Sequence, residues 1–194
     1  MKTNCYKKSI KIQWLIQVFL LIVLFCAFLS GNLNAKTAKE IDASVDAAIE
    51  RFYKQVKGAR EFVEKSKGML VMPNVVKGAF IIGGEYGEGA LRVGGKSVDY
   101  YNTISGSIGF QIGGQAKDII LLFMTDEALK QFRASKGWEA GVDGNVALIN
   151  VGAGERADTR TLKDPIVGFV FDAKGLIADI SLKGAKFSKL DKRE

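Results

Sequence analysis

The sequence predicts an α+β domain in which an N-terminal amphipathic helix packs on a strongly twisted, glycine-rich, mostly antiparallel sheet or partial barrel, with one short inserted helix. Three observations predict this fold class. An apolar stripe of helical period comes first, a long series of strand-like segments follows, and glycines stand at alternate positions within several of those segments. Glycines placed in this way allow strands to bend and to approach one another closely.

The first 35 residues have the pattern of a secretory signal peptide. A stretch with four lysines and no acidic residue precedes an apolar run of 16 residues (14–29), and a small residue follows at Ala35. We expect cleavage after about Ala35 and export to the periplasm or the extracellular space. A retained N-terminal membrane anchor is the alternative. A lipoprotein modified at Cys26 is disfavoured, because Phe25 stands where such sites need a small residue.

Residues 36–194 are expected to form a single domain. Both cysteines belong to the leader, so this domain has no thiolate and no disulfide. Without the four basic residues of the leader, 24 basic residues remain against 21 acidic ones, a net charge of +3. Such a small excess of positive charge is a weak argument for nucleic acid, and we expect no nucleic-acid partner.

The domain begins with a helix. Thr37 and Glu40 are spaced as a capping box, and apolar residues then recur at intervals of three and four, at Ile41, Val45, Ala48, Phe52, Val56, Ala59 and Val63. Acidic residues dominate the first half of this helix and basic residues the second, which suits the helix dipole. Gly58 is expected to divide the helix, and Gly68 is expected to end it.

Strand-like segments dominate the rest of the chain. They are residues 69–72, 79–82, 90–93, 104–115, 119–124, 141–151, 166–171 and 176–182. Turns are predicted at Pro73–Asn74, Gly94–Gly95 and Lys174–Gly175.

Three of these elements allow a finer prediction. In segment 104–115, one side of the strand is expected to face the core and bears Ile104, Ile108, Phe110 and Ile112. Segment 119–124 is apolar on both faces and is expected to lie centrally in the sheet. Thr125 is expected to cap the inserted helix, because Asp126 and Glu127 would then lie in its first turn.

The composition excludes several kinds of catalytic site. The chain has no histidine, which excludes Ser-His-Asp triads, histidine-ligated zinc and a histidine general base. The adjacent acids Asp126 and Glu127 are better explained as a helix terminus than as a catalytic pair. We therefore predict no catalytic residue, no metal site and no cofactor. A pocket with convergent carboxylates would favour an enzyme instead.

One segment matches a loose phosphate-loop pattern. Residues 90–97, ALRVGGKS, end in Gly-Lys-Ser, but the phosphate-binding mechanism needs a helix after the loop. The following residues are rich in β-branched and aromatic types, which favour a strand. We therefore predict a hairpin turn at Gly94–Gly95 rather than a nucleotide site.

A basic cluster near the end of the first helix is the candidate binding site. Its members are Lys54, Lys57, Arg60, Lys65 and Lys67, and they accompany the aromatic residues Phe52, Tyr53 and Phe62. A basic amphipathic helix is able to lie in a membrane interface. The alternative is a helix whose apolar side packs in the core and whose charged side is solvated.

Three sequence blocks resemble those of the SYLF-domain family. The first is KGMLVMPNVVKGAFIIGGEYGEG (67–89), the second GSIGFQIGGQ (106–115) and the third KGLIADISLKG (174–184). They occur in the family's order, and the resemblance covers roughly residues 40–187. Asp179 stands where glycine is usual in the third block.

The resemblance implies a non-catalytic lipid-binding or membrane-binding domain. Eukaryotic SYLF proteins bind phosphoinositide membranes partly through a basic N-terminal segment, and some yeast members bind actin. By this resemblance the expected partner is an anionic lipid or membrane surface, contacted by the basic cluster and by Lys77. An envelope structural or protein-interaction module without a lipid ligand is the alternative, and an exposed apolar patch would favour it.

Overall fold

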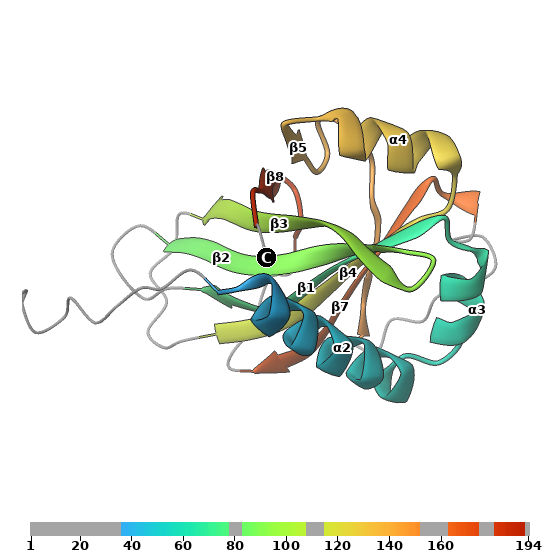
Figure 1. The fold of residues 1–194 in the computed structure, drawn as a ribbon, viewed down its shortest axis with the longest axis horizontal. Helices are drawn as coiled ribbons and strands as arrows, with labels where there is room; N and C mark the ends of the chain where they lie inside the picture. The colour runs from blue at the N-terminus through green and yellow to red at the C-terminus, as the bar shows by residue number, and fades with distance from the viewer. Residues whose placement is uncertain (1–35, 78–82, 108–114, 152–162, 175–180, 193–194) are drawn as a thin grey trace, which may run out of the picture. The chain divides into compact units, whose positions relative to one another are not determined.

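The computed structural model describes residues 36–77, 83–107, 115–151, 163–174 and 181–192 (Figure 1). The predicted fold class is confirmed: an N-terminal helix accompanies a strongly curled, mostly antiparallel sheet. The helices are α2 (Ala38–Gln55), α3 (Ala59–Lys65) and α4 (Asp126–Ala134). The strands are β1 (Gly68–Lys77), β2 (Gly83–Val93), β3 (Lys96–Ser107), β4 (Gln115–Phe123), β5 (Gly137–Glu139), β6 (Ala147–Asn150), β7 (Ile166–Lys174) and β8 (Lys186–Leu190).

The eight described strands form one sheet in the order β5-β8-β3-β2-β1-β4-β7-β6. Neighbouring strands are antiparallel except β6 and β7, which are parallel. The long strands β1 and β4 lie in the middle, and the three-residue β5 and four-residue β6 form the two edges.

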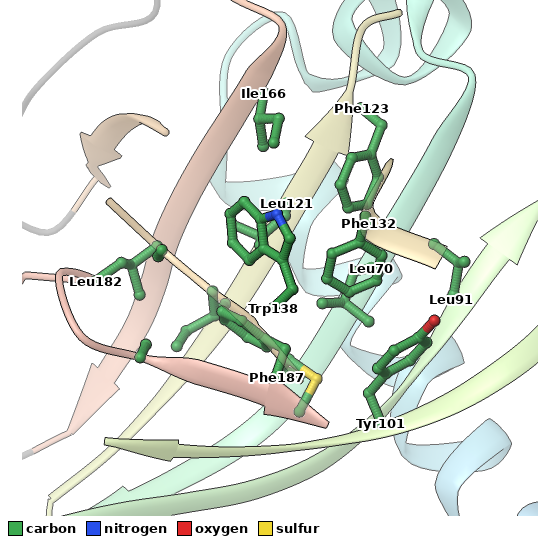
Figure 2. Close-up of a cluster of buried hydrophobic side chains, with 14 of the residues drawn as sticks. Leu70, Leu91, Tyr101, Leu121, Phe123, Phe132, Trp138, Ile166, Leu182 and Phe187 are labelled. Atoms are coloured by element: carbon green, nitrogen blue, oxygen red, sulfur yellow. The ribbon is translucent and has the colours of Figure 1, made fainter. Parts of the chain in front are cut away.

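Each face of the sheet carries its own core. Helices α2 and α3 cover one face, which we call the helix face, and pack on Val71 of β1, Ile120 of β4 and Phe169 of β7. Helix α4 covers the opposite face through Phe132, whose ring lies 4.8 Å from Phe123, centroid to centroid. Figure 2 shows the aromatic and aliphatic side chains that surround Phe132.

Residues Lys36–Glu194 form one compact unit by their contacts. Among the described residues, both cores begin at Ile41 or later. Within the described residues, no helix is both long enough and apolar enough to cross a bilayer. The predicted leader, residues 1–35, lies outside the described residues.

The predicted start of the first helix is confirmed. The Thr37 hydroxyl accepts from the Glu40 amide at 3.3 Å, and the Glu40 carboxylate accepts from the Thr37 amide at 2.8 Å. Gly58 divides the helix as predicted, with a φ of +80° that disfavours any residue with a side chain.

The predicted helix end at Gly68 is wrong. Helix α3 ends at Lys65, and the Ser66 hydroxyl donates to the Val63 carbonyl at 2.8 Å. Gly68 is instead the first residue of β1 and pairs with Phe123. Glycine suits this place because a Cβ there would lie 3.0 Å from the Leu129 side chain on α4.

Strand β1 is longer than predicted. The expected turn at Pro73–Asn74 is a bulge within the strand, because the β1–β4 register shifts between Met72 and Val75. Asn74 adopts a φ of +50°, a conformation that asparagine tolerates better than most residues. The chain therefore bends at this bulge and continues as β1 to Lys77. Gly83, Gly84, Gly87 and Gly89 all lie within strand β2.

The hairpin prediction is confirmed, since Gly94 and Gly95 connect β2 to β3. Strand β3 begins at Lys96 rather than at residue 104, so this strand was placed too late. Ile104 is 54% exposed and does not face the core as predicted. Ile108, Phe110 and Ile112 lie outside the described residues, as does the predicted strand 79–82.

The buried strand 119–124 and the helix capped by Thr125 are confirmed as β4 and α4. Segment 141–151 contributes only the short β6, and β7 extends three residues beyond its predicted end at residue 171. Strands β5 and β8 were not predicted. In segment 176–182 only Ser181 and Leu182 are described, and they are not in a strand; the turn residue Gly175 is also outside the described residues.

Candidate functional site

Five of the six candidate residues lie at or near the short turn between α2 and α3. Lys54 is in the last turn of α2, Lys57 precedes α3, and Arg60 is in its first turn; all three are exposed. Lys65 and Lys67 are exposed at the end of α3 and just before β1. The two helices and the short turn between them therefore expose all five side chains to solvent.

The apolar side of these helices belongs to the core. Phe52 and Phe62 are buried, and their rings lie 5.0 Å and 5.4 Å from the ring of Phe169, centroid to centroid. Val56 is also buried in this cluster. In this structure the apolar side of the helices packs in the core, as the core-packed alternative expects, and the charged side is the exposed one.

The five bases differ in how strongly they are neutralised. Lys65 lies 2.6 Å from Glu61, and Lys67 lies 3.9 Å from Asp126. The Arg60 guanidinium lies 4.7 Å from the ring centre of Tyr53, a cation–π contact. Lys54 and Lys57 form no ion pair with any residue that the structure describes. These two lysines are the most available cations of the cluster.

Lys77 does not lie with the other five. It is the last residue of β1, whereas Lys67 immediately precedes the first. At about 3.3 Å per residue, the two ends of this strand are roughly 30 Å apart. The sequence places Lys77 near the cluster only along the chain, and a lipid-binding role for it remains a prediction.

Two polar clusters fix α2 on the sheet. Arg51 donates to Asp118 of β4 at 2.6 Å, and the same carboxylate accepts from the Asn74 amide at 2.8 Å, inside the β1 bulge. At the other end of α2, Asp42 accepts from Ser97 and from Tyr100 at 2.5 Å and 2.9 Å. The position of the basic cluster therefore depends on these anchors.

These anchors were not recognised in the sequence. Asp118 stands alone before the apolar run of β4, a signal that a buried carboxylate has a structural partner. Its partner Arg51 lies 67 positions earlier, and no local pattern connects the two.

One cleft of about 320 Å³ lies between the segment after β5, strand β6 and residues 181–183. Its described lining includes Val146, Leu148 and Leu182, with Asn145, Ser181 and Lys183 as polar members, and no carboxylate. This cleft does not show the convergent carboxylates that would favour an enzyme.

The comparisons with known proteins identify the family. Residues 104–193 match the model of the Ysc84 family, described as Las17-binding protein actin regulator. The match includes the second and third blocks that resemble SYLF domains, and the first block lies outside it. No curated protein sequence matches the chain. The domain part spanning residues 104–193 thus matches the SYLF-domain family, as the sequence blocks predicted.

Proposed function

We propose that this chain is a non-catalytic domain that binds anionic lipid surfaces through the bases of α2 and α3. One observation carries the proposal: Lys54, Lys57 and Arg60 are exposed on α2, on α3 and in the turn between them, whereas the apolar side of both helices is buried. Helix α2 is fixed to the sheet by Arg51 and Asp42, so the bases are presented without folding on binding.

The contact is peripheral and electrostatic. Residues 54–67 contain five basic and two acidic residues, a net charge of +3. Since each net positive charge near an anionic leaflet contributes about 1 kcal/mol, the cluster supplies roughly 3 kcal/mol, or about a hundredfold in partition. Such binding weakens steeply as salt shortens the Debye length.

The expected setting is an exported protein that meets a membrane of the cell envelope. The basic and apolar pattern of residues 1–35 supports export, by a cleaved signal peptide or with a retained anchor. The family description names an actin regulator, and we do not extend that activity to this chain.

The test is flotation of residues 36–194 with vesicles of phosphatidylglycerol and phosphatidylcholine, and with phosphatidylcholine alone, across a salt series. Lys54→Glu with Lys57→Glu is expected to abolish the preference for anionic vesicles, because it reverses two charges that no described residue neutralises. The matched control, Lys130→Glu with Lys136→Glu, reverses two exposed charges, one in the middle of α4 and one just after it, and should retain the preference. Equal flotation of wild-type protein with both kinds of vesicle would refute the proposal.

A further inference from the structure

A buried carboxylate on β2 lacks a hydrogen-bond donor. Glu88 stands two residues before Ala90, shares its face of the strand and is only 7% exposed. One carboxylate oxygen, Oε1, accepts from the Tyr86 hydroxyl at 2.7 Å. The other, Oε2, is buried and accepts a hydrogen bond from none of the described residues. An ionised oxygen without a donor is strongly destabilising in the interior, so this atom calls for a ligand that donates.

A second acceptor lies opposite the first. Glu88 pairs with Asn102 of β3, so the two side chains are neighbours on the same face of the sheet. The carboxamide oxygen of Asn102 is also buried, and it too has no donor among the described residues. Two neighbouring acceptors, one of them charged, suit an ammonium group, which has three N–H donors and a positive charge.

One ammonium group already lies beside this site. The Lys192 side chain, just beyond β8, is 12% exposed, and its Nζ lies 3.5 Å from Glu88 Oε2, an ion pair without a hydrogen bond. The same Nζ donates to the backbone carbonyl of Lys36 at 2.7 Å. A single ammonium group therefore separates Glu88 from the backbone of Lys36, the residue that directly follows the predicted cleavage point.

Cleavage after Ala35 would change the chemistry of the Lys36 nitrogen. In the uncleaved chain this nitrogen is a neutral peptide amide with one hydrogen. Cleavage converts it into an α-ammonium group with three donors, carried by the residue whose carbonyl lies at the site. A positive charge next to the first turn of α2 is unfavourable by itself, because of the helix dipole, and an adjacent carboxylate compensates it.

Two carboxylates lie near this end of α2. Glu40 is exposed, and it already accepts from the Thr37 amide at 2.8 Å and from the Thr37 hydroxyl at 2.9 Å. Glu88 is buried and has an oxygen without a donor. An ion pair with Glu88 is screened less by water than one with Glu40, so Glu88 is the stronger acceptor for a new ammonium group.

We propose that Glu88 binds the α-ammonium group of Lys36 once residues 1–35 are removed, so that processing completes a buried ion pair that the uncleaved chain lacks. This inference rests on the export by a cleaved leader contained in the proposed function. It assigns a receptor for the new chain end to β2, and it makes removal of the leader a stabilising event for the domain.

The experiment compares two chains of wild-type sequence. One is residues 36–194 released from a fusion so that it begins at Lys36, and the other carries an additional Gly-Ser before Lys36. The extension moves the charged amine away by up to about 7 Å and leaves a neutral amide at Lys36. We expect the extended chain to melt about 5 °C lower, the size expected for one buried, charge-assisted hydrogen bond in a domain of this length.

Two variants identify the acceptor. Glu88→Gln removes the charge and keeps an oxygen for the Tyr86 hydroxyl, and in this background the extension should no longer lower the melting temperature. Glu40→Gln is the matched control, since it removes the other carboxylate near Lys36, and there the extension should keep its effect.

A second measurement needs no variant. The two chains of wild-type sequence are treated with limiting acetic anhydride at about pH 7, and acetylation of the α-amine is followed by peptide mass spectrometry. The amine of Lys36 should react about tenfold more slowly than the amine of the extension, because an ammonium group held by a buried carboxylate seldom releases its proton.

The outcomes decide between the possible ligands of Glu88. Equal melting temperatures and equal acetylation rates of the two wild-type chains overturn the inference and leave Lys192 or water as the donor to Glu88. An effect of the extension that disappears in Glu40→Gln and persists in Glu88→Gln also overturns it, because the amine then pairs with the exposed acid. None of these readouts involves vesicles, so a failure here is distinguishable from a failure of the proposed lipid binding.

Discussion

Replacement of Gly89 by alanine should destabilise the domain strongly. Gly89 lies in β2 beside the β1 bulge, where β1 comes unusually close. An added Cβ would overlap the carbonyl oxygen of Val71 and lie 2.9 Å from the Cα of Met72. Both are backbone atoms of the neighbouring strand, so no side-chain rotation relieves the overlap and the two central strands must separate.

Overpacking of this kind costs typically 1–3 kcal/mol, and a contact with backbone atoms belongs at the upper end, about 3 kcal/mol. For a domain of 159 residues, that loss lowers the melting temperature by about 6–12 °C. The assay is urea unfolding of residues 36–194 monitored by circular dichroism. The slope of the unfolding free energy against urea concentration is compared between variants.

Gly106→Ala is the matched control. Gly106 is also in a strand, has no heavy atom within 4 Å of its added Cβ, and is exposed. The alanine there should leave stability unchanged or raise it by about 0.5–1 kcal/mol. If the free energy of unfolding of Gly89→Ala lies within about 0.5 kcal/mol of the wild-type value, β1 and β2 separate freely. The close approach of the strands then does not explain why position 89 is glycine.

Two further predictions concern the ends and anchors of α2. Asp118→Ala should lower the free energy of unfolding in urea by about 3 kcal/mol, because it leaves the half-buried Arg51 and the Asn74 amide without their acceptor. Asp118→Asn keeps an acceptor for that amide and should lose less stability. Equal losses in the two variants would contradict this explanation. Hydrogen bonds from the Thr37 amide, and secondarily from its hydroxyl, lower the pKa of Glu40. A carboxyl group whose pKa is lowered on folding stabilises the fold above its ordinary pKa, and this stability is lost as the pH falls through the folded-state pKa. Glu40→Gln should therefore destabilise the domain at about pH 7 and much less near pH 3. Unfolding measured at the two pH values checks this.

Elements governed by local chemistry were predictable from the sequence. The Thr37–Glu40 cap, the break at Gly58, the Gly94–Gly95 hairpin and the helix after Thr125 all depend on residues a few positions apart. The exposure of the candidate bases followed in the same way, since the helical period assigns them to the side opposite Phe52.

Elements governed by distant partners were not predictable in this way. Gly68 looked like a helix terminus, but pairing with Phe123 draws it into β1. The chain continues through Pro73–Asn74 because the Asn74 amide finds the carboxylate of Asp118, 44 positions later. Ile104 was predicted to face the core from the alternation of apolar and polar residues. That alternation does not reveal which part of the sheet a helix leaves uncovered. The exposed neighbours Val76, Tyr86 and Ile104 were likewise not predictable, because they come together only through the register of β1, β2 and β3.

The two edge strands have a consequence for solubility. An open sheet exposes unpaired amides and carbonyls along its outer strands, where another chain is able to add a strand and begin aggregation. Among the described strands, the glycine-rich and apolar ones lie inside the sheet, and the edges are β5 and β6, of only three and four residues. An incoming strand finds too few consecutive partners on either side for a stable ladder. The sheet is thus protected from growing at its edges by the brevity of its outermost strands.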